Sequence, residues 1–255
     1  MYNSFLVDIK RYLLTKSLMI LIFLIAVVEP ITTELIFLFL SKATGNDITV
    51  TMNDYTSFYS TISIFLAIIV TVFLYTEIGE GVIRNKLISG KKRYKILLSY
   101  CLVNSLLAVF LNVVSLLSTS LIPFIFNIRF EINISQLIHY LFVTILAGVS
   151  VSVFYTIIML CFCTNNIVIA IPSLIDIIMK IVMVIVIDAI YPDNGIPKVS
   201  GVSLMIYRGI DRYVPFAYLM GDIRWDDFSY IIGSGIVIVV SIVIGIVVWS
   251  KKDLK

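Results

Sequence analysis

Long apolar runs separated by short polar segments recur along the whole chain. A helix needs about 20 apolar residues, with a range of about 17–25, to cross the hydrocarbon of a membrane. By this criterion the sequence predicts six spans, at about residues 17–41, 58–76, 96–126, 136–162, 167–190 and 229–249. We therefore expect an all-α, polytopic membrane protein in which residues 1–255 form a single transmembrane domain.

Two of the predicted spans contain a proline. The third span is longer than a membrane requires, and we expect it to bend or end near Pro123. The fifth starts next to Pro172, which a helical bundle tolerates because neighbouring groups satisfy the freed backbone. Neither proline changes the number of spans predicted.

The composition agrees with this class and excludes several kinds of chemistry. The chain is 60% hydrophobic and 14% charged, against about 45–50% and about 25% in soluble domains. Its single histidine, His139, cannot form a two-histidine metal site. Cys161 and Cys163 have the wrong spacing for a zinc or redox pair, so we expect Cys101, Cys161 and Cys163 to be packing residues. No catalytic, cofactor-binding or metal-binding residue is predicted.

The basic residues predict the orientation. If the N-terminus is cytosolic, segments 1–16, 77–95, 163–166 and 250–255 are cytosolic too, and they hold twelve of the nineteen Lys and Arg residues. The opposite side holds six, and Lys180 lies within a span. Since basic residues are enriched on the cytosolic side, both termini are predicted to be cytosolic. The same residues flank membrane segments without a basic aromatic surface, so we do not expect a nucleic-acid partner.

Two segments outside the spans also have helical character. Phe5, Ile9, Tyr12 and Leu13 recur at helical spacing, which predicts an N-terminal helix along the membrane surface; the alternative is the frayed start of the first span. The outer segment 191–228 mixes apolar and charged residues and is too long for a structureless loop. We expect short, half-inserted helices there.

Small and polar residues repeat every three to four positions within three spans. Such stripes let helices approach closely in lipid, although they could also line a permeation path. We expect them to pack the bundle. They comprise Asn104, Ala108, Asn112, Ser115 and Thr119, then Thr144, Gly148, Ser152 and Thr156, and finally Ser241 and Gly245.

Three of the charged residues within the predicted spans are candidates for a functional role. Each costs about 2.5–3.5 kcal/mol at the membrane centre on insertion scales. Asp176 and Lys180 are four residues apart, the favourable order for an intrahelical pair. They either neutralise each other or face a subunit interface or transport cavity. Glu29, beside Pro30 in the first span, is a further candidate for a pathway or dimer interface.

The loop at residues 77–95 is basic yet regularly patterned. As a helix from about 77 to 88, it places Ile78, Val82, Ile83 and Leu87 largely on one side. Glu80 and Arg84 are spaced for an ion pair on such a helix. Gly90 can then end the helix in the left-handed conformation, followed by cations that suit a helix C-terminus.

The stretch YTEIGEGVIRNKLISGKKRYKILLSY, at residues 75–100, resembles the first cytosolic loop of type-two ABC exporter permeases, especially the small six-span bacterial ones. The predicted spans, the N-terminal helix, the long outer segment and the basic tail extend the resemblance over nearly the whole chain. The matching positions in the loop are Glu77, Gly81, Ile83, Arg84, Asn85, Lys86, Gly90 and Arg93.

The resemblance implies that this loop holds a coupling helix, which docks into a separate ABC ATPase. It also implies two permease copies, as a homodimer or related heterodimer, in a bacterial cytoplasmic membrane. The dimer interface would form near the first and fifth spans, and the pathway near the second and fifth. The chain has no GxxxxGK[ST] phosphate loop, so ATP and Mg would bind the partner, and this chain is not expected to be an enzyme.

The function expected from the resemblance is ATP-driven export of an amphipathic or antimicrobial peptide, or of another hydrophobic substrate. An ion-coupled secondary transporter is one alternative, although no internal repeat supports it. A non-transport membrane anchor or assembly subunit is another. The basic loop would then serve only to set topology and bind anionic lipid.

Overall fold

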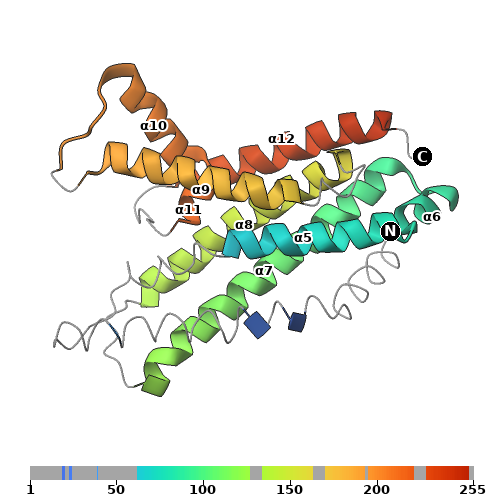
Figure 1. The fold of residues 1–255 in the computed structure, drawn as a ribbon, viewed down its shortest axis with the longest axis horizontal. Coiled ribbons are helices and arrows are strands. Elements are labelled where there is room, and N and C mark those ends of the chain that lie inside the picture. The colour runs from blue at the N-terminus through green and yellow to red at the C-terminus, as the bar shows by residue number, and fades with distance from the viewer. Residues whose placement is uncertain are drawn as a thin grey trace.

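The computed structural model describes residues 62–126, 134–162, 170–192, 195–220 and 228–252, together with residues 19, 20, 23, 24 and 39. Every element in the five longer ranges is helical (Figure 1). The elements are α5 (Ile62–Gly79), α6 (Val82–Ile88), α7 (Arg93–Phe126), α8 (Ile134–Phe162), α9 (Ile171–Ile190), α10 (Gly201–Tyr213), α11 (Pro215–Tyr218) and α12 (Ser229–Lys251).

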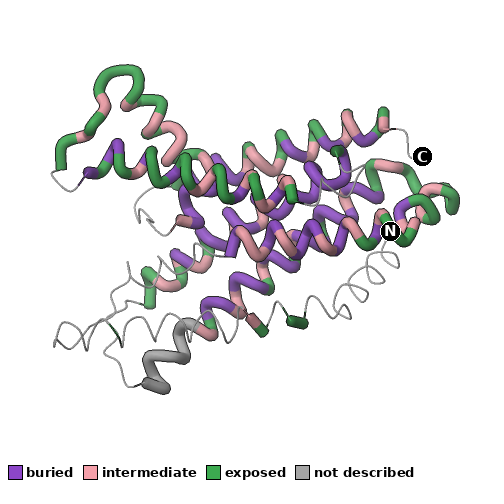
Figure 2. Tube along the Cα trace, in the orientation of Figure 1, coloured by how far each residue is buried: buried purple, intermediate pink, exposed green. Residues whose placement is uncertain are grey.

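Helix α8 is the centre of the bundle. It packs against α5, α7, α9, α11 and α12. In its most apolar stretch of 18 residues, 72% is buried, against 22% in the corresponding stretch of α12. Burial is concentrated where α5, α7 and α8 meet (Figure 2). The outer faces of α9 and α12 are apolar and exposed, as expected of helices that face lipid or another membrane protein.

Four helices of the described chain are long and apolar enough to cross a membrane: Ile62–Gly79, Arg93–Ser118, Ile134–Phe162 and Ser229–Lys251. They correspond to the second, third, fourth and sixth predicted spans. These helices indicate a helical, membrane-embedded protein. The predicted first span, the N-terminal surface helix and Glu29 fall almost wholly outside the described residues.

The fifth predicted span is only partly confirmed. Helix α9 covers Ile171–Ile190 of the predicted residues 167–190, and residues 167–169 lie outside the described part of the chain. It carries Asp176, Lys180 and Asp188, and it is not among the four helices apolar enough to cross. Pro172 lies in its first turn, where a missing backbone N–H breaks no helical hydrogen bond. In contrast, α7 continues through Pro123 and ends at Phe126.

The small-residue stripes pack α7 against α8, as expected. The Asn104 amide donates a hydrogen bond to Thr156 Oγ1 at 2.7 Å, and both side chains are fully buried. A Cβ atom on Gly148 would lie 2.7 Å from Asn112 Nδ2, so a larger residue at position 148 would displace the Asn112 amide. These polar groups therefore hold two helices together rather than face an open path.

The outer segment contains two short helices, which confirms that part of the expectation. All four residues of α11 are buried against the bundle, whereas no residue of α10 is fully buried. The Tyr218 hydroxyl donates a hydrogen bond to the Arg212 carbonyl and thus ties α11 to the end of α10. Helix α12 passes close to this end, since a Cβ atom on Gly233 would lie 2.2 Å from the Tyr213 carbonyl oxygen.

The contact at Gly233 provides a matched test of the packing. We expect Gly233→Ala to destabilise the protein by about 1–3 kcal/mol, because the methyl group would displace backbone. Gly235→Ala, two residues away with nothing within 4 Å of its Cβ, should be neutral or stabilising by up to about 1 kcal/mol. Thermal unfolding in detergent measures both. Equal stability of the two variants would contradict the packing of α10 on α12.

Candidate functional site

The loop between α5 and α7 forms a compact turn that contains α6. Helix α5 ends at Gly79, and Gly81 has a φ of 69° immediately before α6. The prediction of one helix over residues 77–88 is therefore wrong. Glycine is costly inside a helix, by about 1 kcal/mol, yet it adopts positive φ without strain, so the chain turns at Glu80 and Gly81. Gly90, with a φ of 80°, ends the segment as predicted.

Helix α6 has one face on the bundle and one face exposed. Ile83 is 3% exposed, and Ile78 and Leu87 pack against the same core, as their spacing predicted. Val82, predicted on the same side, is only half-buried. The opposite side of α6 is exposed. We call these exposed residues the outer face of α6: Arg84, Asn85 and Ile88 of the helix, together with Glu80 of the turn before it.

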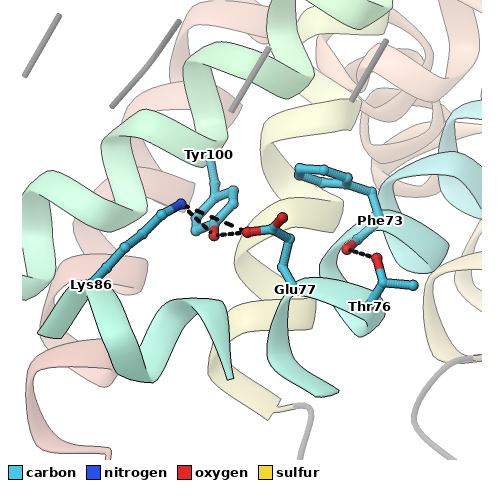
Figure 3. A network of polar contacts seen from close by, with 5 residues as sticks. All are labelled: Phe73, Thr76, Glu77, Lys86 and Tyr100. Atoms are coloured by element: carbon cyan, nitrogen blue, oxygen red, sulfur yellow. Dashed lines mark hydrogen bonds and ion pairs between the residues drawn. The ribbon is translucent and has the colours of Figure 1, made fainter. Parts of the chain in front are cut away.

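A buried polar network joins α6 to the helices on either side (Figure 3). The Tyr100 hydroxyl of α7 donates a hydrogen bond to Glu77 Oε2 of α5 at 2.7 Å. Lys86 Nζ of α6 donates to the same hydroxyl at 2.8 Å and lies 3.7 Å from Glu77 Oε2. It also lies 4.3 Å from the Tyr100 ring centroid, within range of a cation–π contact. Three helices thus share one ion pair.

Arg93, at the start of α7, binds the C-terminal end of α12. Its guanidinium donates hydrogen bonds to the carbonyl oxygens of Trp249 at 3.1 Å, Ser250 at 3.2 Å, and Lys252. These are the carbonyls that a helix leaves unsatisfied, and a cation there also complements the helix dipole. Lys252 Nζ in turn donates to the Leu160 carbonyl of α8 at 2.8 Å. These hydrogen bonds therefore join the ends of α7, α8 and α12, while α6 packs on α5 and α7.

The predicted coupling residues fall into three groups. Glu77, Lys86 and Arg93 point into the bundle and connect helices, and Ile83 belongs to the core. Gly81 and Gly90 form the two turns. Glu80, Arg84 and Asn85 lie on the exposed face.

The sequence prediction missed the residues that bind these side chains. Tyr100 lies inside an apolar run, where an aromatic residue gives no sign of a polar role. Lys252 was interpreted only as a topological charge. The separations of Arg93 from Trp249 and of Lys252 from Leu160 are 156 and 92 residues, so helical periodicity carries no information about them.

Asp176 and Lys180 form the pair that their spacing predicted. Lys180 Nζ lies 3.1 Å from Asp176 Oδ2, and the Asp176 side chain is fully buried. Tyr155 of α8 donates a hydrogen bond to Asp176 Oδ1 at 2.7 Å, a contact that the sequence did not predict. One carboxylate oxygen thus accepts a hydrogen bond from α8, while the other lies in the ion pair with Lys180 and accepts no hydrogen bond in the described part of the chain. This arrangement links α8 to α9, and the second reading, a transport cavity or subunit interface, stays a prediction.

Comparison of the chain with protein-family models and with curated proteins gives no match. The site must therefore be interpreted from its geometry and its own residues.

The network around Glu77 can be tested with two tyrosine variants. Tyr100→Phe removes the hydroxyl between Glu77 and Lys86, and losing a partner of a buried carboxylate costs about 1–3 kcal/mol. We expect faster amide hydrogen exchange in α6 and unchanged exchange in the centre of α8. Tyr94→Phe, one and a half turns away and 41% exposed, is the matched control and should change neither. Unchanged exchange in Tyr100→Phe would show that the network does not hold α6.

Proposed function

We propose that this chain is the membrane subunit of an ATP-driven exporter of the ABC class, and that α6 docks into a separate ATPase. The observation that carries the proposal is the division of α6 into two faces. Its inner face is fixed to the ends of the long helices, whereas Glu80, Arg84, Asn85 and Ile88 remain exposed. Ile88 is 74% exposed, and an apolar residue next to charged groups is typical of a protein contact.

The connections of α6 suit the transmission of motion. A displacement of its outer face would reach α5 and α7 through the Glu77–Lys86–Tyr100 network. From α7 the displacement would reach α12 through Arg93. From the end of α12 it would reach α8 through Lys252. Because these contacts join the ends of the helices, a displacement of α6 would move the helices as a unit.

The energy for transport would come from the partner. The sequence has no phosphate-binding loop of the GxxxxGK[ST] kind, so ATP and Mg would bind the ATPase.

Two copies of this chain would work with two ATPases. The exposed apolar face of α9, with Leu174, Ile177, Ile178, Ile181 and Ile185, is available for the second copy. The direction, export from a bacterial cytoplasm, follows from the family analogy.

The substrate is proposed from the same analogy and not from a residue. An amphipathic or antimicrobial peptide, or another hydrophobic molecule, is the substrate class that such small permeases suggest.

A secondary transporter would instead need an ion site at mid-membrane. Asp176 is the strongest candidate for such a site, and both of its oxygens already lie against Tyr155 and Lys180. This internal pairing argues against an ion site at Asp176 and so favours an ATP-driven exporter over a secondary transporter.

The double variant Glu80→Ala/Arg84→Ala tests docking. We expect it to insert and fold normally but to lose co-purification with its ABC ATPase, together with vanadate-sensitive export. The charged groups at the contact would be removed, while the inner face of α6 stays intact. Co-expression followed by purification measures the complex, and reconstituted liposomes measure transport.

The pair Asp188→Ala/Lys198→Ala is the matched control. It also removes one acid and one base. Asp188 lies near the C-terminal end of α9, 2.6 Å from Lys198, and both side chains are more than half exposed. Exposed pairs of this kind contribute about 0–1 kcal/mol, so complex formation should not change. If the α6 variant kept both the complex and export, or if the control lost them equally, docking through α6 would be refuted.

A further inference from the structure

A cavity of about 590 Å³ lies between the end of α9 and helix α10. The cavity is open to its surroundings. Helix α10, which carries most of the lining residues, lies at the end of the bundle opposite α6 (Figure 1). The wall of the cavity combines two guanidinium groups with aromatic and apolar side chains. The lining residues are Tyr191, Met205, Arg208, Gly209, Arg212 and Tyr213.

Helix α10 is amphipathic in a way that suits a membrane surface. Val202, Met205 and Ile206 are 73%, 75% and 55% exposed, and they occupy one stripe at helical spacing. Arg208 and Arg212 form a neighbouring stripe, one turn apart, along the cavity. A helix with an apolar stripe beside a basic one lies in the headgroup region with its apolar side toward the acyl chains.

The two arginines favour an anionic occupant. Arg208 and Arg212 lie along the cavity, and with Asp211 beside them this turn of α10 keeps one net positive charge. A guanidinium group presents paired donors that match two phosphate oxygens. Asp188, an acid at the neighbouring end of α9, is held by Lys198 at 2.6 Å.

The cavity is held in place from several sides. The Lys198 amide donates a hydrogen bond to the Ala189 carbonyl at 2.9 Å, which returns the chain to α9 before α10 begins. At the other end, Tyr218 binds the Arg212 carbonyl, and Gly233 brings α12 against Tyr213. These contacts fix the backbone of α10 that carries Arg208 and Arg212.

We propose that this cavity binds the phosphate headgroup of an anionic phospholipid, with an acyl chain lying along Val202 and Ile206. Arg208 and Arg212 bind the phosphate. Tyr191 and Tyr213 lie where aromatic rings with a polar tip are favoured, between headgroups and hydrocarbon. This lipid site stands independently of the proposed transport function, because it uses other residues at the other end of the bundle.

Hydrogen exchange in nanodiscs tests the proposal at the site itself. Adding phosphatidylglycerol to phosphatidylcholine discs should slow amide exchange in residues 201–214 of the wild-type chain. In Arg208→Gln/Arg212→Gln we expect this protection to disappear. At about 1 kcal/mol for each basic residue, two residues correspond to roughly thirtyfold weaker binding. Exchange in the centre of α8 reports whether the variant remains folded and should be the same in both chains.

Two further arms identify the ligand and the residues. Inorganic phosphate added to phosphatidylcholine discs should give no protection; protection by phosphate alone would assign the site to a free anion and overturn the lipid assignment. Lys91→Gln/Lys92→Gln removes the same charge from exposed residues at the opposite end and should leave the protection of residues 201–214 intact. Loss of protection in this control, or its persistence in the arginine variant, would refute the proposal.

Discussion

The buried carboxylate of Glu77 constrains the whole end of the bundle at which α6 lies. It ends an apolar helix, is 4% exposed, and therefore needs partners inside the protein. Tyr100 and Lys86 supply them at 2.7 and 3.7 Å. Because these partners come from α7 and α6, the two contacts at Glu77 Oε2 form only when all three helices are in place. The polar contact thus determines the position of α6, which has only seven residues and little core of its own.

The rest of this end follows from unsatisfied backbone groups. The last carbonyls of α12 lack helical partners, and Arg93 binds three of them. Lys252 binds the Leu160 carbonyl near the end of α8. Cations from the basic loop and from the C-terminal tail therefore act as caps across helices. Charges that also favour a cytosolic location have a second, structural role here.

Helical periodicity and apolar length were sufficient to predict much of the fold. The four candidate spans, the α7–α8 seam and the short helices of the outer segment all match features visible in the sequence. The break at Glu80 and Gly81 was not predicted, because the residues on both sides favour a helix and only the φ of Gly81 shows the turn. The predicted end of the fifth span at residue 190 matches the end of α9, and residues 167–169 lie outside the described part of the chain.

The candidate site was predictable only in part. The spacing within residues 77–95 indicated which apolar residues of α6 face the core, and the spacing of Asp176 and Lys180 indicated their pairing. The partners that complete each network, Tyr100 and Tyr155, lie 23 and 21 residues from the carboxylates they bind. Such contacts depend on how helices pack against one another, which local pattern does not specify.

The central claim is that the outer face of α6 contacts an ATPase. The most direct measurement is photo-crosslinking with a benzoylphenylalanine residue in place of Ile88, in cells that co-express the ABC ATPase. Val202, 73% exposed on α10 at the other end of the bundle, serves as the comparison position. The account predicts a crosslinked product with the ATPase from position 88 and none from position 202. No product from position 88, or equal products from both positions, would contradict it.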